Sequence, residues 1–395
     1  MTLSVRPLTA DDAEAARQLG FEAFGVPTSP PTEPASVDHP GRSSFGAFDG
    51  ETLVAKIVDR DFDSYYGGVA IPTAGIAGVT VAAEYRGRGA LGPLFTTLFA
   101  AAKERGAVIS TLFPTAPRIY RRFGYEVVAD FVTVRLPTSA LASVRPAEGL
   151  RTRRAMASDV AAIRTVYDTW AAEQNGPLTR RGPSFPGTAD EYLAGFTGVT
   201  VAVDAADVVH GYASWNRGQG YGEKAVLEIE DLLAIDAGGY RALMLAMGSF
   251  SSVTYQTKLD TSGDDIARTF LPSLHWEVVE TSPYMLRVLD VGAALSLRRY
   301  PTGFEGELAF QLAGDFGGDG DGGYILDVGN GRGNCLRAEH GDRIFTPQGL
   351  ALMYAGTQSS ANLRVAGHLS GGDVDDDSTW DALFGGRQQH IRNYF

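Results

Sequence analysis

The sequence has one cysteine in 395 residues, so the chain cannot form an internal disulfide bond. It has no uncharged apolar run long enough to cross a bilayer, and its first residues lack the apolar stretch of a signal peptide. Basic residues are also few, since 34 Lys and Arg stand against 47 Asp and Glu, for a net charge of −13. This charge disfavours a protein that follows nucleic-acid phosphates. We expect a cytoplasmic protein with neither membrane nor nucleic-acid partners.

The chain does contain enough apolar residues, at 44%, to bury a sizeable core. A length of 395 residues is too great for one ordinary domain, and we expect two or three. The single cysteine, Cys335, lies in a strand-like segment without an identifiable partner histidine, so we expect it to be buried rather than catalytic. The acidic balance favours a cationic substrate.

One stretch of the sequence combines a strand, a glycine-rich turn and a helix start. Residues 79–81 alternate β-branched side chains on one face, residues 86–89 read Arg-Gly-Arg-Gly, and residues 90–102 form a helical run rich in Ala and Leu. Such a junction directs free backbone N–H groups and the helix dipole at one point, which suits a phosphate. The glycines let a ligand approach the main chain, and the two arginines add positive charge. The alternative is a glycine turn without a ligand.

The segments around this turn predict alternating strands and helices. We expect, in chain order, a hairpin turning at Asp49-Gly50, a strand over 70–82, a helix over 91–105, a buried strand over 108–113 and a short helix over 117–123. Residues 25–44 are rich in Pro and Ser, which indicates a long surface loop.

The chain also contains an internal repeat. Residues 153–164 echo residues 6–17, which indicates that the same fold begins twice. Further on, residues 238–243 align with residues 86–91, and in this alignment the first arginine and the second glycine of the turn are replaced. We therefore predict a degenerate second copy without the cofactor.

A third pattern begins after residue 289. It predicts strands over 303–312, 323–328 and 334–338, followed by a helix over 346–354.

The spacing Arg86-x-x-Gly89 after a strand resembles the pyrophosphate-binding signature of the GNAT superfamily of acyl-CoA N-acyltransferases, with Leu91 in place of the last small residue. The segment Ile119-Tyr120-Arg121-Arg122-Phe123-Gly124-Tyr125 and the order of the units resemble the enhanced intracellular survival family of bacterial N-acetyltransferases. The resemblance implies an α/β (α+β) chain of two tandem GNAT folds, the second degenerate, followed by a sterol-carrier-protein-like αβ domain. The expected domains are residues 1–137, 150–288 and 289–395.

The same resemblance assigns a co-substrate and an assembly. It implies acetyl-CoA as the acetyl donor, a homohexamer, and no metal site. The cofactor-binding residues that follow from it are Val79, Thr80, Val81, Arg86, Gly87, Arg88, Gly89, Ala90, Leu91, Gly92, Thr115 and Ala116.

Two groups are expected to carry the chemistry. By family match Tyr120 is the general acid beside the CoA sulfur, whereas Tyr125 is expected to serve packing. The first unit shows no obvious histidine or glutamate base, and the resemblance assigns that role to the C-terminal carboxylate, here of Phe395. His390 is an alternative base, but we expect it on the surface or in a cap.

These features predict an acetyl-CoA-dependent N-acetyltransferase that acts on amines of a polyamine- or aminoglycoside-like small molecule. Some relatives have acidic residues where this chain has Asn393-Tyr394 and Gly25-Val26, so another amine stays open. The alternatives are a protein or peptide lysine acetyltransferase and, in another class, a lipid or small-ligand carrier that uses the last unit.

Overall fold

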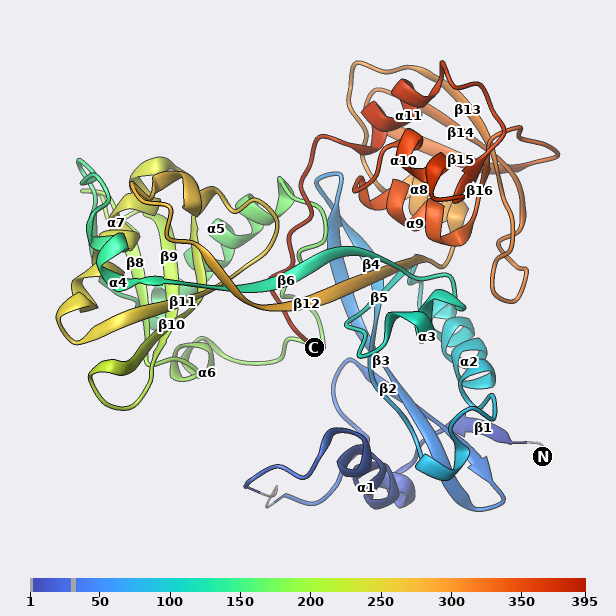
Figure 1. Ribbon diagram of the computed structural model, residues 1–395, viewed down its shortest axis with the longest axis horizontal. Coiled ribbons are helices and arrows are strands. Elements are labelled where there is room, and N and C mark those ends of the chain that lie inside the picture. Colours follow the sequence, from blue (N-terminus) through green and yellow to red (C-terminus); the bar gives the residue numbers. More distant parts are fainter. Residues whose placement is uncertain (1–2, 30–32) are drawn as a thin grey trace.

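The computed structural model describes residues 3–29 and 33–395 and has three lobes (Figure 1). We call residues 1–137, 150–288 and 289–395 the first, second and third unit, after the predicted ranges. In Figure 1 the first unit (blue and cyan) lies below the third (orange and red), and the second unit (green and yellow) lies beside them. In the described part of the chain, no helix combines the length and the apolar character needed to cross a membrane.

The first unit is a sheet with helices packed against it. The strands are β1 (Ser4–Pro7), β2 (Arg42–Asp49), β3 (Thr52–Tyr66), β4 (Val69–Val81) and β5 (Ile109–Leu112), and the helices are α1 (Ala13–Phe24), α2 (Leu91–Glu104) and α3 (Pro117–Arg121). The predicted hairpin is confirmed, because Asp49 pairs with Thr52. Helix α2 buries Leu94, Phe95 and Leu98, the spacing of one helical face. The loop predicted over 25–44 extends from α1 to β2, although residues 30–32 lie outside the described residues.

The second unit repeats this order of elements. Its strands are β7 (Arg151–Arg154), β8 (Gly198–Val203), β9 (Val209–Arg217), β10 (Gly222–Ala234) and β11 (Thr254–Thr261), and its helices are α5 (Val160–Ala172), α6 (Ala189–Ala194) and α7 (Ala237–Gly248). A short helix, α4 (Thr138–Ala142), precedes it.

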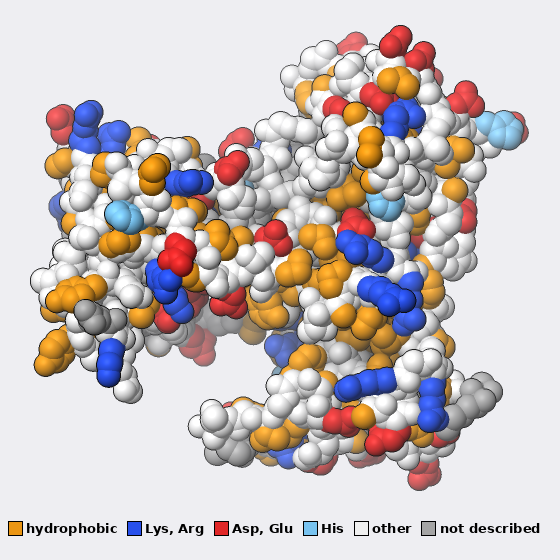
Figure 2. Space-filling model, in the orientation of Figure 1, with side chains coloured by type: hydrophobic (Ala, Val, Ile, Leu, Met, Phe, Trp, Pro, Cys, Tyr) orange, Lys and Arg blue, Asp and Glu red, His pale blue; other side chains and the backbone are white. Residues whose placement is uncertain are grey.

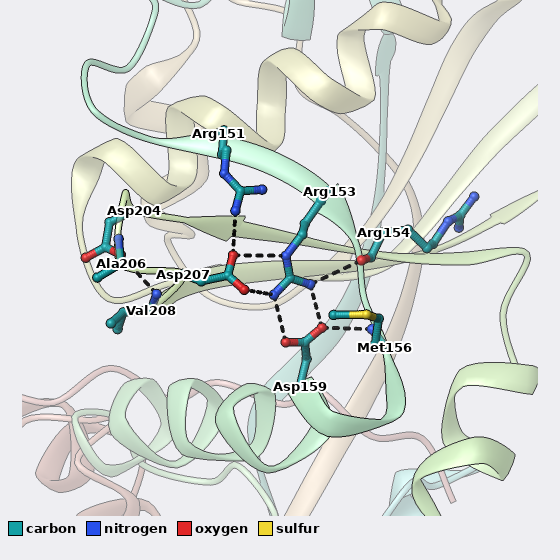
Figure 3. Close-up of polar contacts among 9 residues, drawn as sticks. All are labelled: Arg151, Arg153, Arg154, Met156, Asp159, Asp204, Ala206, Asp207 and Val208. Atoms are coloured by element: carbon teal, nitrogen blue, oxygen red, sulfur yellow. Dashed lines mark hydrogen bonds and ion pairs between the residues drawn. The ribbon is translucent and has the colours of Figure 1, made fainter.

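The repeat extends to single contacts at the start of each unit. In Figure 3, Arg153 Nη1 donates to Asp159 Oδ2 at 2.6 Å, and the same oxygen accepts the N–H of Met156 at 2.8 Å. In the first unit Arg6 and Asp12 form the equivalent pair at 2.7 Å, and Asp12 accepts the N–H of a residue three positions earlier. The echo of residues 6–17 in residues 153–164 is therefore confirmed.

The first two units exchange strands. β6 (Glu126–Pro137) and β12 (Glu277–Val288) cross between them as a long antiparallel pair (Figure 1). The end of β12 pairs with β5 of the first unit, and the end of β6 pairs with β11 of the second. One twelve-stranded sheet results, in the order β1-β2-β3-β4-β5-β12-β6-β11-β10-β9-β8-β7. Neither unit completes its sheet from its own residues.

The structure corrects the alignment of residues 238–243 with the turn at 86–91. Those residues are not a turn but part of α7, which begins at Ala237. Only two residues separate α7 from the end of β10. In the first unit nine residues, 82–90, separate β4 from α2. The second unit therefore lacks the turn itself rather than single residues within it. The sequence alignment was misleading because small residues such as glycine occur both in turns and at the start of a helix.

The third unit contains the predicted strands and helix. Its elements are α8 (Val291–Leu297), β13 (Gly306–Leu312), β14 (Gly322–Gly329), β15 (Arg332–Ala338), β16 (Ile344–Phe345), α9 (Pro347–Ala355), α10 (Ser360–Val365), β17 (Leu369–Ser370) and α11 (Asp377–Phe384). Aromatic rings fill its core, with Phe310 stacked on Tyr324 at 5.2 Å and Trp380 on Phe384 at 5.9 Å. Cys335 is buried, as predicted, and burial raises the pKa of its thiol to about 12.

Candidate active site

The strand that enters the predicted turn, β4, separates from its neighbour β5. The two strands pair over residues 73–76 of β4 and 109–112 of β5, whereas β4 continues to Val81. The register of β3 and β4 shifts at Gly78, whose φ of +56° is that of a bulge. Beyond the bulge, β4 has no strand partner on its β5 side in the described residues. The two strands therefore splay apart, which leaves main-chain groups open to an extended ligand.

The turn between β4 and α2 presents its main chain to solvent. Gly87 and Gly89 have φ values of +76° and +82°, and a Cβ atom at either position would meet nothing within 4 Å. The first turn of α2 has neither a side-chain cap nor an acidic residue, so its N–H groups and positive dipole end are open to an anion. This arrangement fits the diphosphate of acetyl-CoA.

Basic side chains gather on the same region of the first unit. Figure 2 shows Lys and Arg side chains over α3 and below it. The exposed arginines of the turn and of α3 and its end are Arg86, Arg88, Arg118, Arg121 and Arg122. Arg121 is paired with Glu126 at 2.7 Å, whereas the others add positive potential to a chain of net charge −13. Such a local excess of positive charge attracts phosphates.

The remaining predicted cofactor-binding residues lie on three elements around the splay. Val79, Thr80 and Val81 end β4; Ala90, Leu91 and Gly92 open α2; and Thr115 and Ala116 lead into α3. The hydroxyl of Thr80 is buried and has no hydrogen-bond partner among the described residues. Thr115 is exposed, and Ala116 is half-buried as the residue that caps α3. The structure therefore brings all of these residues to one end of β4, β5 and α2.

Tyr120 and Tyr125 differ in what their hydroxyl groups do. The hydroxyl of Tyr125 lies 2.6 Å from Ser110 Oγ, and the side chain is fully buried. The hydroxyl of Tyr120 makes no hydrogen bond within the described residues, although its ring packs edge-on against Phe95 at 6.2 Å. Burial raises the pKa of Tyr120 to about 12, so the phenol holds its proton at neutral pH. This geometry agrees with packing for Tyr125 and leaves Tyr120 free to donate a proton.

The C-terminus enters the space between the first two units. In Figure 1 the red tail leaves the third unit, passes the β6–β12 crossing and ends at the centre of the molecule. The ring of Phe395 packs against Phe62 of β3 at 4.9 Å and Phe113 at 5.4 Å. A Cβ atom at Gly75 of β4 would lie 2.4 Å from the ring of Phe62 and 3.1 Å from that of Phe395, so glycine lets both rings pack on this strand. The terminal residue therefore lies against the strands that splay.

The tail is held by hydrogen bonds to the second and third units rather than frayed. Gln389 Nε2 donates to the carbonyl of Ala355 at 2.6 Å, and the N–H of Ile391 donates to Ser262 Oγ at 2.8 Å. Arg392 is buried and donates to Asp265 at 2.6 Å. Among the described residues, no Lys, Arg or His nitrogen lies within 4.0 Å of the terminal carboxylate. The Arg60 guanidinium lies over the ring of Phe395, 5.9 Å from its centroid.

The structure corrects the expectation that His390 lies on the surface or in a cap. His390 is only 5% exposed, and its Nδ1 lies 3.1 Å from Ser262 Oγ. Burial, together with the charge of Arg392, lowers the pKa of His390 to about 4. Its ring is neutral at pH 7 and serves to fix the tail.

Two adjoining cavities, of about 560 and 470 Å³, open beside the tail on its second-unit side. They share Phe131, Glu230, Asp260 and Tyr394 as a common wall. The second cavity is also lined by Glu228 and Glu280, with Lys258 as its basic residue. Desolvation and neighbouring carboxylates raise the pKa of Glu230 and of Asp260. The first cavity is also lined by Arg164, Arg180, Arg181 and Arg392, so the clear excess of negative charge is in the second cavity.

Sequence reasoning missed the ion pairs that anchor the tail. Arg180 donates to Asp231 and to Asn393, and Arg392 donates to Asp265. Nothing in the sequence distinguishes these residues from surface charges, because their partners are 51 to 213 positions away. Only the fold brings them together.

The second unit fills the position that corresponds to the phosphate-binding turn. Asp236 caps α7, and its Oδ1 accepts the N–H of Gly239 at 2.7 Å. Its other oxygen lies 2.6 Å from His210 Nδ1. This helix start carries its own anion, which agrees with the prediction that the second copy does not bind the cofactor.

Family comparisons cover the first and last units. Residues 4–128 match the acetyltransferase (GNAT) domain family, and residues 291–392 match the sterol carrier protein domain family.

Similar proteins and structures cover the whole chain. An uncharacterized N-acetyltransferase of Streptomyces griseus is 28% identical over 97% of both chains. The N-acetyltransferase Eis of Mycobacterium tuberculosis is 25% identical over 82% of this chain and 81% of its own. The crystal structure of a GCN5-related N-acetyltransferase from Kribbella flavida has a TM-score of 0.84 at 26% identity, over 100% of this chain and 98% of its own. Eis1 from Mycobacterium abscessus has the same fold, with a TM-score of 0.77 at 21% identity over the full length of both chains.

Proposed function

Because the chain belongs to the Eis-like group of GNAT N-acetyltransferases, we propose that it acetylates amines of a polyamine- or aminoglycoside-like small molecule with acetyl-CoA as the donor. N-acetyltransferase activity follows from the GNAT domain and from relatives that are named as N-acetyltransferases. The acceptor class and the roles of Tyr120 and Phe395 are what we propose.

One observation carries the proposed mechanism, namely that the last residue of the chain lies against the splayed strands. Phe395 packs on Phe62 and Phe113, and its ring lies next to Gly75 of β4. An α-carboxylate with an ordinary pKa of ~3.5 is ionised at pH 7, so it can accept a proton from the substrate. In this proposal the base comes from the end of the third unit and acts in the first unit, which carries the phosphate-binding turn.

The proposed reaction is direct transfer. The amine nitrogen attacks the thioester carbonyl, so that a C–N bond forms and the C–S bond breaks. The Phe395 carboxylate takes a proton from the amine, directly or through water, and Tyr120 gives a proton to the departing thiolate. A main-chain N–H of the splayed part of β4 stabilises the oxyanion. The two protons are then exchanged with solvent, which returns both groups to their starting state.

The charge beside the tail supports a cationic acceptor. Glu230, Asp260 and Glu280 border the cavities that Tyr394 also lines. The raised pKa values of Glu230 and Asp260 reflect desolvation and mutual repulsion, which a bound ammonium group would relieve. Aromatic rings of Phe131 and Tyr394 in the same wall suit the methylene and ammonium groups of an amine.

The third unit favours the enzyme over the lipid-carrier alternative. Its core is occupied by stacked rings, including Phe310 on Tyr324 and Trp380 on Phe384. Filling of this kind leaves little room for an acyl chain without repacking. We propose that this unit instead delivers the tail to the first unit.

The test is an acetyl-transfer assay with a panel of acceptors. The full-length protein is incubated with acetyl-CoA and a monoamine, a diamine, spermidine, an aminoglycoside or a lysine-containing peptide, while thiol release is followed. We expect release with the multiply charged small amines. Release with the peptide alone would establish the lysine acetyltransferase, whereas no release with any acceptor, together with no heat of acetyl-CoA binding, would refute the proposal.

A further inference from the structure

Arg180 of the second unit makes the hydrogen bond to the tail that lies nearest to the end of the chain. We infer that Arg180 is a positioning residue for the Phe395 carboxylate, an inference that rests on the proposed role of that carboxylate as the base. Arg180 Nε donates to Asn393 Oδ1 at 3.0 Å, and its Nη2 donates to the carbonyl oxygen of Arg392 at 3.4 Å. Asn393 lies two positions before the end of the chain, so this contact fixes the position from which the last two residues extend.

The other polar anchors act further from the carboxylate. The backbone of His390 and Ile391 bonds to Asn175 and Ser262, and the guanidinium of Arg392 bonds to Asp265. In the part of the chain that the structure describes, no hydrogen bond or ion pair from another residue reaches the last two residues. They make ring contacts, such as the 4.4 Å approach of the rings of Tyr394 and Phe113 and the Arg60 guanidinium 5.9 Å from the centroid of the Phe395 ring. Arg180 is therefore the last directional restraint on the base.

The Arg180 side chain is itself held on several sides. Its Nη2 lies 3.0 Å from Asp231 Oδ1, and its Nη1 donates to Tyr212 at 3.3 Å. The guanidinium also lies over the ring of Tyr167, with 4.1 Å to the centroid. Asp231 is 3% exposed, and its pKa is lowered by the charge of Arg180 against the opposing effect of burial. Because the Arg180 side chain is held rigidly, it can fix the position of Asn393 in addition to contributing a positive charge.

The backbone at Arg180 supports the same reading. Its φ is +53°, in the left-handed region that non-glycine residues seldom occupy. Such a conformation carries a conformational cost and persists where the surroundings require it. Here it belongs to the residue whose side chain joins β10 to the tail.

The partner of Arg180 comes from the place where the second unit also splays. β10 pairs with β11 only as far as Ile229. Its register against β9, on the other side, shifts between Ile229 and Asp231, and the strand continues to Ala234. The corresponding part of β4 is open to the acyl donor in the first unit. The second unit has thus kept the open end of β10. There Asp231 holds Arg180, which in turn holds the tail that ends in the proposed base.

The variant Asn393→Ala tests this link without disturbing the buried ion pair. We expect kcat with an accepted amine to fall roughly ten- to hundredfold, because a displaced base loses its alignment. The KM for acetyl-CoA is expected to stay unchanged, since the turn and α2 are untouched. The acid limb of the kcat/KM profile is expected to move, because a displaced carboxylate leaves the surroundings set by the rings of Phe62 and Phe113 and by the Arg60 guanidinium, which lies 5.9 Å from the centroid of the Phe395 ring.

Two substitutions of Arg180 and one control complete the series. Arg180→Lys keeps a positive charge beside Asp231 and is expected to retain part of kcat, whereas Arg180→Gln is expected to lose most of it. Arg151→Gln removes an exposed arginine of the same unit that pairs with Asp207 (Figure 3), and it is expected to change neither kcat nor the pH profile. A purely structural role of Arg180 would lower the melting temperature without moving the acid limb.

The outcomes separate this inference from the proposed function. Wild-type kcat and an unmoved acid limb in Asn393→Ala would overturn the positioning role, and this variant decides alone if Arg180→Gln does not fold. A protein whose Phe395 ends in an amide and stays fully active refutes the base itself. An inactive amide together with fully active Asn393→Ala and Arg180→Lys refutes only the role of Arg180.

Discussion

The two tandem units differ most at the helix that follows their long splayed strand. Between β4 and α2 the chain has nine residues, and the first turn of α2 is free of side-chain caps. Between β10 and α7 it has two residues, and Asp236 caps the helix. One unit offers backbone N–H groups to a phosphate, whereas the other satisfies them with its own carboxylate.

The difference shows how a duplicated unit can lose a ligand site and keep its fold. A short turn and one aspartate replace the cofactor's phosphates as partners of the helix start. The segment η5 (Ile266–Phe270), which follows β11 as α3 follows β5, contains no tyrosine. In the proposed mechanism the chemistry belongs to the first unit, and the second contributes position through Arg180. Each prediction below tests one side of this comparison.

The largest effect is expected from the terminal carboxylate, which only the first unit receives. Conversion of the Phe395 carboxylate to an amide by ligation should lower kcat by about 10²- to 10⁴-fold, because general-base catalysis is lost. Steady-state kinetics with an accepted amine measure this. Phe395→Leu keeps the carboxylate and should retain far more activity, and equal losses in the two proteins would assign the effect to packing.

The next largest effect concerns Tyr120 of α3, because η5, the corresponding segment of the second unit, contains no tyrosine. Tyr120→Phe should lower kcat by roughly 10²-fold while the Kd for acetyl-CoA, measured by calorimetry, stays the same, because only the proton donor is removed. Tyr125→Phe removes a hydroxyl that bonds to Ser110 and should mainly lower stability. Unchanged turnover in Tyr120→Phe would remove this residue from the role of acid.

A carboxylate placed at the open helix start should make the first unit resemble the second. Gly92→Asp adds an acidic side chain in the first turn of α2, where a Cβ atom meets nothing within 4 Å. Its charge should repel the phosphates and raise the KM for acetyl-CoA by about tenfold, which corresponds to ~1.4 kcal/mol. The neutral control Gly92→Ala should leave KM unchanged, so a similar rise in both variants would point to shape rather than charge.

The reverse change in the second unit should affect stability and not catalysis. Asp236→Ala removes the cap of α7 and should lower the free energy of unfolding by about 1 kcal/mol, as measured by chemical denaturation. Kinetic constants for acetyl-CoA should match the wild type. A raised KM would contradict the view that this helix start has no ligand.

The smallest effect expected is a pH dependence of stability that comes from the pair of His210 and Asp236. The hydrogen bond to Asp236 raises the pKa of His210 in the folded protein. The stabilisation is therefore complete below the unfolded pKa of ~6.5 and is lost as pH rises through the higher folded value. Between pH 6 and 8.5 the melting temperature should fall more in the wild type than in His210→Asn. Parallel curves would show that the pair contributes nothing measurable.

Local patterns in the sequence predicted much of the fold and part of the site. The hairpin at Asp49-Gly50, the strand and helix around the turn, and the elements of the third unit all agree with the structure. Each depends on residues close together in the chain, such as turn glycines or the apolar face of α2. The alignment of residues 238–243 was wrong because Gly-Gly-Tyr-Arg is compatible with both a turn and a helix, and helix packing decided between them.

By itself the sequence determined the duplication, the open turn at residues 86–89 and the distinction between the units, since these are properties of short segments. Only the tertiary structure decided that β6 and β12 are exchanged, that Phe395 lies against Phe62, and that Arg180 holds the tail. The physical reason is sequence separation. These contacts join residues that are more than a hundred positions apart, and their energy depends on burial and geometry that no local pattern records.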